Sequence, residues 1–226
     1  MLLAIDTSTE TAGLALADNG RCLVETTWFC GQNHTVQLIP RLKDLLDKAG
    51  AGLDTVSGIA VARGPGSFNG LRVGISVAKG LAFSLSVPVV GVGTLEISAY
   101  QHAACCLPVC AIQNAGRGEI ATATYRLKDN LWQQTTPECI TTLDKLLDEV
   151  VEKTLFCGEY AGIAGGLITQ KLGDLAVVPS QAALLRRACY LAELGNRLIS
   201  EGKDEPVAVL QPLYLRRPPI TERKHI

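Results

Sequence analysis

The stretch that decides the fold is residues 63–74, which read Arg-Gly-Pro-Gly-Ser-Phe-Asn-Gly-Leu-Arg-Val-Gly. It follows an apolar segment with strand character, residues 57–62, and opens a helical pattern at residues 71–85. Glycine lets the backbone approach a partner closely, and proline stiffens the turn. The free N–H groups at the start of the helix, together with Arg63 and Arg72, can cradle an anion. A tight strand-to-helix turn without a ligand explains the stretch equally well, and it lacks the Gly-Lys-Ser/Thr of a Walker A motif.

The segments around this loop predict one α/β lobe. Three of them have strand character and predict a β-meander: residues 1–6, 11–17 and 21–29. Residues 35–49 carry apolar side chains at helical spacing. The strand at 57–62, the helix at 71–85 and a strand at 87–92 form a βαβ unit, which predicts parallel pairing. A short helix is expected at 95–104.

The second half of the chain predicts a second lobe with less regular patterning. Strands are expected at residues 108–113, 119–127, 131–135, 154–157 and 175–178. Helices are expected at 142–153 and 181–201, and the second carries a stripe of leucines. The pattern breaks near residues 103–108, so we place the lobes at residues 1–104 and 105–226. Strands followed by helices, twice over, predict two related lobes.

Composition narrows the class of protein. A formal net charge of −1 over 226 residues argues against a protein that grips nucleic acid mainly through its phosphates, so contact with RNA is expected to be indirect or shared. Charge is spread along the sequence, and the one basic cluster lies at the C-terminal end: Arg216, Arg217, Arg223 and Lys224. The first residues lack the features of a signal peptide, and no apolar run is long enough to span a bilayer. We therefore expect a cytoplasmic protein without membrane association, whose eight cysteines stay reduced.

Few residues suggest chemistry. The run Asp6-Thr7-Ser8-Thr9 ends the first strand, and its carboxylate and hydroxyls can hold a metal-bound phosphate. A hydrogen-bonded turn is the simpler interpretation of the same run. Gly158-Glu159-Tyr160-Ala161-Gly162 follows a buried strand and is either a second phosphate loop or a plain turn. The three histidines are scattered, and the cysteines form no Cys-x-x-Cys pair, so the sequence predicts no metal site and no catalytic residue.

Four segments together resemble the bacterial TsaB (YeaZ) family, subunits of tRNA threonylcarbamoyladenosine biosynthesis. They are residues 5–9, the pattern His34-Thr35-x-x-Leu38-x-Pro40, the glycine loop at 64–74, and Pro212-x-Tyr214-Leu215-Arg216. The resemblance is close up to about residue 100, as far as the strand and short helix that follow the glycine loop, and thin beyond it. It implies an α/β chain with the actin-like (ASKHA) fold, in which each of two lobes has a mixed β-sheet flanked by helices.

The resemblance also implies a non-catalytic scaffold subunit. In this family TsaB pairs with the catalytic paralogue TsaD, and the ATPase TsaE joins the pair. Together they transfer a threonylcarbamoyl group to the adenosine beside the anticodon of tRNAs that read codons beginning with A. TsaD holds its metal on a His-x-x-x-His helix, and Thr94 and Ser98 stand at those positions here. Because neutral hydroxyls are weak ligands for divalent metals, we expect no activity from the chain alone and only indirect contact with tRNA.

Two sets of site residues follow. A phosphate or nucleotide site is predicted at Asp6, Thr7, Ser8, Thr9, Gly64, Gly66 and Ser67. Ten residues on two helices are predicted to bind TsaD, or a second copy when the chain is alone: His34, Leu38, Arg41, Leu42, Gly70, Leu71, Arg72, Gly74, Ile75 and Ala78. The alternative is that these glycines pack against the chain's own sheet.

Departures from the family pattern weaken the case for a nucleotide. Asn69 stands where the family usually has threonine, Asn114-Ala115-Gly116 replaces Asp-Ala-Arg, and Gly158-Glu159-Tyr160 replaces a looser Gly-Asp-Gly. We expect no tightly bound cofactor and at most weak binding of ATP or ADP with magnesium. Two other functions are compatible with parts of the pattern: a stand-alone actin-like ATPase or small-molecule kinase, and a glycoprotease-like peptidase.

Overall fold

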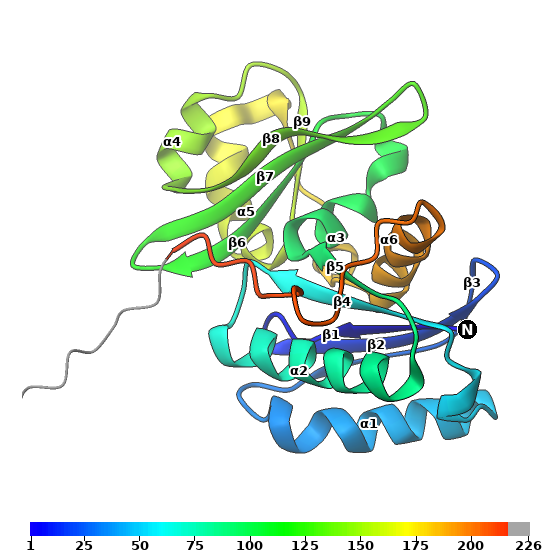
Figure 1. Cartoon of the computed structure of the whole chain (residues 1–226). Helices are drawn as coiled ribbons and strands as arrows, with labels where there is room; N and C mark the ends of the chain where they lie inside the picture. The colour runs from blue at the N-terminus through cyan, green and yellow to red at the C-terminus, as the bar shows by residue number, and fades with distance from the viewer. Residues whose placement is uncertain (217–226) are drawn as a thin grey trace, which may run out of the picture.

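The computed structural model describes residues 1–216, so Arg217, Arg223, Lys224 and His225 lie outside the described part. The chain forms two lobes, and each is built around a five-stranded mixed sheet (Figure 1). Within residues 1–216, no helix has both the length and the apolar character needed to cross a membrane.

The sheet of the first lobe joins a meander to a βαβ unit, as the sequence predicts. Its strands lie in the order β3 (Arg21–Phe29), β2 (Thr11–Asp18), β1 (Leu2–Asp6), β4 (Gly58–Gly64) and β5 (Val89–Gly93). β1 pairs antiparallel with β2 and parallel with β4, and β4 pairs parallel with β5. The prediction of parallel pairing around the glycine loop is confirmed.

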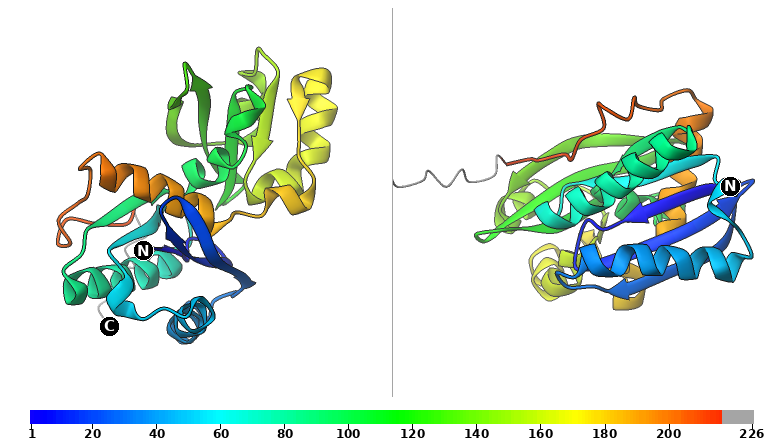
Figure 2. Two further views of the ribbon diagram at one scale, coloured as in Figure 1. Left: turned by 90° about the vertical axis from the view of Figure 1, so that its right-hand side faces the viewer. Right: turned by 60° about the horizontal axis from the view of Figure 1, so that its bottom comes forward.

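Helices cover both faces of this sheet. α1 (His34–Ala49) and α2 (Phe68–Leu85) lie on the outer face, and α6 (Ala188–Ser200) lies on the face toward the second lobe (Figure 2). Alternate residues of β1 point to opposite faces, so Leu3 and Ile5 pack under α1 and α2 while Leu2 and Ala4 pack under α6. α2 begins three residues earlier than the predicted helix because Ser67 caps it, accepting a hydrogen bond from the Gly70 N–H.

The position of α6 corrects the predicted lobe boundaries. The sequence assigns residues 181–201 to the second lobe, but α6 begins at Ala188 and packs on the first sheet. The contact is close: a Cβ added to Gly195 would lie 2.3 Å from the Cβ of Ala60. Residues 203–214 also run along the first lobe, where the Leu213 N–H donates to the carbonyl of Arg63. Because β1 and β4 are apolar on both faces, the first sheet needs a helix on its second face, and α6 supplies it.

The second lobe is centred on an antiparallel hairpin. Its strands lie in the order β10 (Ala176–Val177), β9 (Thr154–Cys157), β6 (Val109–Gly116), β7 (Glu119–Lys128) and β8 (Leu131–Thr141). Its helices are α4 (Leu143–Asp148) and α5 (Glu159–Leu172). The sequence predicts no helix at α5, because its three glycines at positions 162, 165 and 166 disfavour a helix by propensity. The run from Gly158 is therefore the start of a helix and not a free phosphate loop.

A short helix, α3 (Thr94–Tyr100), connects the lobes. Leu95 and Ala99 belong to the hydrophobic core of the second lobe, whereas Ile97 belongs to the core under α6. Short 3₁₀ helices complete the described structure: Leu53–Thr55, Ala103–Cys105, Gly173–Leu175 and Gln181–Leu184. Since one helix contributes to both cores, the two lobes are packed together and not merely tethered.

One pair of cysteines departs from the expectation that all are reduced. Cys22 on β3 and Cys189 on α6 form a disulfide, although 167 positions separate them in the sequence. The return of α6 to the first sheet brings them together. The other six cysteines are free thiols.

Candidate functional site

Asp6, at the end of β1, is buried and held by the turn that follows it. The backbone N–H of Ser8 donates to Asp6 Oδ1 at 2.9 Å, and the Ser8 hydroxyl donates to the same oxygen at 2.6 Å. These contacts are those of a hydrogen-bonded turn, the simpler of the two interpretations of this run. They occupy one carboxylate oxygen and leave the other, Oδ2, for a further partner.

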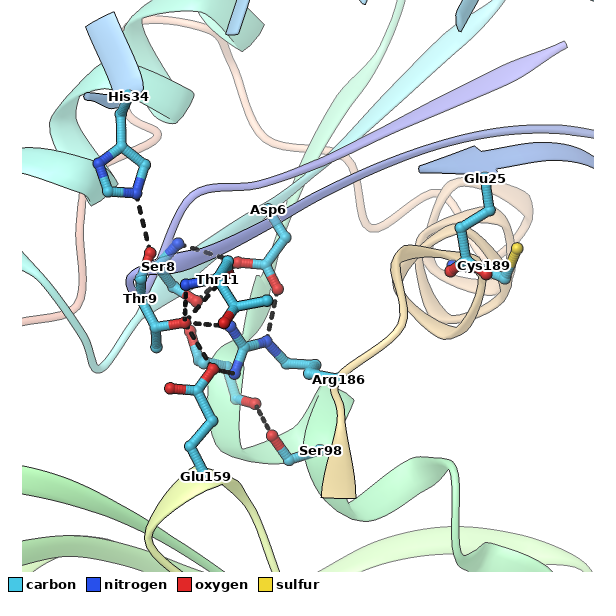
Figure 3. A network of polar contacts seen from close by, with 11 residues as sticks. Asp6, Ser8, Thr9, Thr11, Glu25, His34, Ser98, Glu159, Arg186 and Cys189 are labelled. Atoms are coloured by element: carbon cyan, nitrogen blue, oxygen red, sulfur yellow. Dashed lines mark hydrogen bonds and ion pairs between the residues drawn. The ribbon is translucent and has the colours of Figure 1, made fainter. Parts of the chain in front are cut away.

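That partner is Arg186, in the segment that leads into α6 (Figure 3). Its Nε donates to Asp6 Oδ2 at 2.5 Å, its Nη2 donates to Thr9 Oγ1 at 3.0 Å, and its Nη1 donates to Glu159 Oε1 at 3.3 Å. Arg186 is only 5% exposed. The guanidinium therefore joins the turn after β1 in the first lobe to the first residue of α5 in the second.

Charge favours this arrangement in spite of burial. Burial alone lowers the pKa of Arg186, but the carboxylates of Asp6 and Glu159 outweigh it and raise the pKa above the usual value. Thr9 completes the network, because its hydroxyl donates to Glu159 Oε1 at 2.6 Å while it accepts from Arg186. A buried charge is tolerated when it is paired and hydrogen-bonded, and all three guanidinium nitrogens are.

The glycine loop closes against the same turn. The Ser67 N–H donates to the carbonyl of Ser8 at 2.7 Å, and the Thr7 hydroxyl donates to the carbonyl of Gly70 at 2.7 Å. A Cβ at Gly70 would lie 2.1 Å from the carbonyl oxygen of Thr7, and one at Gly74 would lie 2.2 Å from the Thr7 hydroxyl. These two glycines therefore let α2 approach the turn after β1, within the chain's own lobe.

This packing corrects the residue-level prediction of the interface. Eight of the ten predicted side chains are buried in the first lobe: His34, Leu38, Leu42, Gly70, Leu71, Gly74, Ile75 and Ala78. The His34 ring, for example, contacts the carbonyl of Thr9 through Nε2 at 2.8 Å. Only Arg41 and Arg72 are exposed, and they lie over the rings of Trp28 and Phe68. That α1 and α2 as helices bind a partner stays a prediction.

Of the seven predicted nucleotide residues, Gly66 lines a pocket beside the glycine loop. The pocket has a volume of about 370 Å³, and residues of the β6–β7 hairpin and of the C-terminal segment line it together with Gly66. Residues 6–9 are not among the lining of this pocket, and their side chains bond to Arg186, to α2 and to one another. Gly64 instead meets the carbonyl of Leu213, from which an added Cβ would lie 2.7 Å. The two predicted phosphate loops thus hydrogen-bond to each other, and a nucleotide at these residues stays a prediction.

The two positions that correspond to the metal-binding histidines lie on α3. Thr94 and Ser98 are buried between the lobes, and the Ser98 hydroxyl donates to the carbonyl of Thr94 at 3.1 Å. Within residues 1–216, no group of three or more His, Cys, Asp or Glu side chains is placed to hold a metal ion. The Ser98 hydroxyl is therefore bonded to the backbone of its own helix.

Glu96 on α3 gives a pH-dependent prediction. Burial raises the pKa of Glu96 from 4.5, in spite of the nearby Arg197, and the carboxylate of Glu138 raises it further. An acid whose pKa is raised by folding destabilises the folded state once the pH rises above its unfolded pKa. Glu96→Gln should therefore raise the free energy of unfolding at neutral pH, and the gain should shrink below the usual pKa of glutamate. Urea unfolding of the variant and of the unmodified chain, at neutral pH and below the usual pKa of glutamate, measures the difference in stability. A variant less stable than the unmodified chain at neutral pH would contradict the prediction.

The sequence did not point to Arg186. The only signal is the pair Arg186-Arg187 inside a stretch otherwise rich in alanine and leucine. A buried arginine requires a carboxylate partner, but its partners lie 180 and 27 positions away, at Asp6 and Glu159. Periodicity within the segment cannot identify them.

Comparison with known proteins agrees with this architecture. A family model described as "TsaD: tRNA N6-adenosine threonylcarbamoyltransferase" matches residues 29–220. The chain is 33% identical to the tRNA threonylcarbamoyladenosine biosynthesis protein TsaB of Bacillus subtilis (strain 168), over 95% of this chain and 93% of that protein. It is 31% identical to TsaB of Escherichia coli (strain K12), over 95% of this chain and 94% of that protein.

Solved structures show the same fold. YeaZ from Pseudomonas aeruginosa superposes with a TM-score of 0.78 at 30% identity and covers 94% of this chain and 99% of that one. The (R)-2-hydroxyglutaryl-CoA dehydratase component A of Acidaminococcus fermentans, at 11% identity and a TM-score of 0.54, covers 88% of this chain and 98% of that one and shares the fold alone. The predicted actin-like fold with two lobes is confirmed. The chain belongs to the TsaB (YeaZ) family, and its role is in threonylcarbamoyladenosine biosynthesis in tRNA, in the system that contains TsaD.

Proposed function

We propose that this chain is a non-catalytic scaffold subunit that binds and supports TsaD through the outer surface of α1 and α2. The observation that carries the proposal is the apolar character of this surface. Val36 and Ile39 on α1 are 68% and 52% exposed, and Phe83 on α2 is 80% exposed. Exposed apolar side chains on two neighbouring helices are typical of a surface for a protein partner.

The shape of α2 also suits a helical partner. Ser76, Gly80 and Phe83 follow one another at helical spacing on its exposed side. Gly80 leaves the backbone bare there, because a Cβ at this position would meet nothing within 4 Å. In the absence of TsaD, we infer that two copies of the chain cover the same surface as a homodimer.

The rest of the proposed assembly follows from the family. TsaE joins through the TsaB–TsaD pair, and tRNA contacts this chain only indirectly, consistent with a formal net charge of −1. Because its role is in tRNA modification, we propose that the protein acts in the cytoplasm. The hydroxyls at Thr94 and Ser98, where the resemblance puts metal-binding histidines in TsaD, support a partner without activity of its own.

Gly80→Arg tests the proposal. The substitution adds a long cation to the outer surface of α2 and is tolerated by the fold, because the site is open and arginine is the better helix former. Retention of TsaD in a pull-down should fall at least tenfold, and the chain alone should elute as a monomer. Ala78→Arg is unsuitable, since Ala78 is fully buried and its replacement would disturb the core.

The matched control is Gly166→Arg on α5, which is also exposed and helical and has nothing within 4 Å of its added Cβ. It should bind TsaD and dimerise as the unmodified chain does. Undiminished TsaD binding by folded Gly80→Arg would reject this surface, and equal loss in both variants would show that the effect is not specific to α2.

A further inference from the structure

The sequence predicts a phosphate or nucleotide site, with magnesium, at the turn that follows Asp6. The residues do not fit that ligand here, because Arg186 already contacts the groups that would hold it. We propose that Arg186 takes the place of the metal-bound phosphate, so that the chain fastens its own two lobes with an internal cation and needs no nucleotide to do so. The proposal is independent of the partner that binds α1 and α2.

The acceptor oxygens of the turn are occupied. Asp6 Oδ1 accepts from the N–H and hydroxyl of Ser8, and Asp6 Oδ2 accepts from Arg186 Nε. Thr9 Oγ1 accepts from Arg186 Nη2 and donates to Glu159. A magnesium ion on Asp6 would lie next to the guanidinium, and two cations repel at such a distance.

The net charge of the cluster also disfavours a bound nucleotide. The cluster holds two carboxylates, Asp6 and Glu159, and one guanidinium, so it keeps one net negative charge. A triphosphate that approached the cluster would meet this net negative charge. The cluster is therefore unfavourable to an anion.

The segment that carries Arg186 is anchored on both sides. Leu184 is buried in the core of the second lobe, and Ala188 is buried in the core of the first lobe under α6. Arg186 is midway between them in the sequence. The backbone on either side of Arg186 is therefore held by a different lobe, and its side chain contacts Asp6 and Thr9 in the first lobe and Glu159 in the second.

Removal of the guanidinium should turn the cluster into a cation site. Arg186→Ala leaves two carboxylates and a threonine hydroxyl around a cavity, and these are the oxygen ligands that magnesium or calcium prefers. Free guanidinium should also fit, because it restores the fork that the side chain supplied. Arg187→Ala is the matched control: Arg187 is the next residue, its side chain is 55% exposed, and it pairs with Glu25 outside the network.

The experiment measures the melting temperature and ligand binding of the full chain and both variants. We expect Arg186→Ala to melt well below the unmodified chain, and to recover part of the loss in millimolar guanidinium chloride or calcium chloride but not in sodium chloride of equal ionic strength. Arg187→Ala should show neither effect. Calorimetric titration with magnesium and ATP should give no binding to the unmodified chain at millimolar nucleotide.

Two results would overturn the proposal: an Arg186→Ala variant that melts like the unmodified chain, or magnesium–ATP binding to the unmodified chain as tight as to the variant. If Arg186→Ala does not fold, Arg186→Lys replaces it. Lysine keeps the charge but not the fork that reaches Asp6, Thr9 and Glu159 together, so this variant should fold with a lowered melting temperature. A lysine variant with an unchanged melting temperature would refute the role of the guanidinium geometry.

Discussion

Replacing Arg186 by methionine is expected to lower the free energy of unfolding by about 3–5 kcal/mol, the cost of removing one partner from a buried ion pair. Methionine fills much of the space but leaves Asp6, which is 3% exposed, without a counter-ion. Urea denaturation, followed by circular dichroism, measures the loss. For a chain of this length it corresponds to a fall in melting temperature of roughly 2–4 °C per kcal/mol.

Arg187→Met serves as the control for this prediction. Its ion pair with Glu25 has one half-exposed partner, and such pairs contribute at most about 1 kcal/mol. The two variants carry the same substitution at adjacent positions, so a difference between them reports the environment and not the residue type. Equal stability of the two variants would show that the buried network contributes no more than a surface pair.

Replacing Gly70 by alanine is the second large effect. The added Cβ would lie 2.1 Å from the carbonyl oxygen of Thr7, a backbone atom, so α2 or the turn after β1 must move. Overpacking of this kind costs about 1–3 kcal/mol, and more where backbone must shift. The shift would also strain the bond from the Thr7 hydroxyl to the Gly70 carbonyl. Thermal unfolding of the variant measures the combined loss.

Gly80→Ala, on the same helix, should act in the opposite direction. Its Cβ meets nothing within 4 Å, so the gain in helix propensity of about 0.5–1 kcal/mol is unopposed. Both substitutions replace glycine by alanine within α2, so they change helix propensity in the same way. A difference in stability between the two variants therefore reports the close contact at Gly70. A Gly70→Ala variant more stable than the unmodified chain would mean that the turn after β1 can move without loss of stability.

The sequence predicts the first lobe well for a physical reason. Apart from α6, its strands and helices are neighbours along the chain, and periodicity reports such local order: residues 57–62 and 71–85 appear as β4 and α2 within a few residues. The glycine loop was identified as a site of close approach, but the sequence could not say what approaches. The structure identifies the turn at Thr7 and Ser8.

Non-local contacts account for the errors. α5 is built on small residues whose helix propensity is poor, and packing on the second sheet stabilises it. α6 has the periodicity of a helix, but nothing in residues 188–200 tells which sheet it covers. Within the candidate site, the sequence pointed to Asp6 and Glu159, each in a separate loop. Arg186, the residue that joins them, was missed because charge pairing across the chain leaves no periodic signal.

The return of α6 to the first sheet has a consequence for how the protein is made. Leu2, Ala4, Ala60 and Val90 are covered by a helix that leaves the ribosome only after the whole second lobe. Until α6 has been synthesised, the nascent first lobe leaves this apolar face of its sheet uncovered. Folding of the first lobe therefore cannot finish before the second lobe has been made, although the first lobe comes first in the sequence.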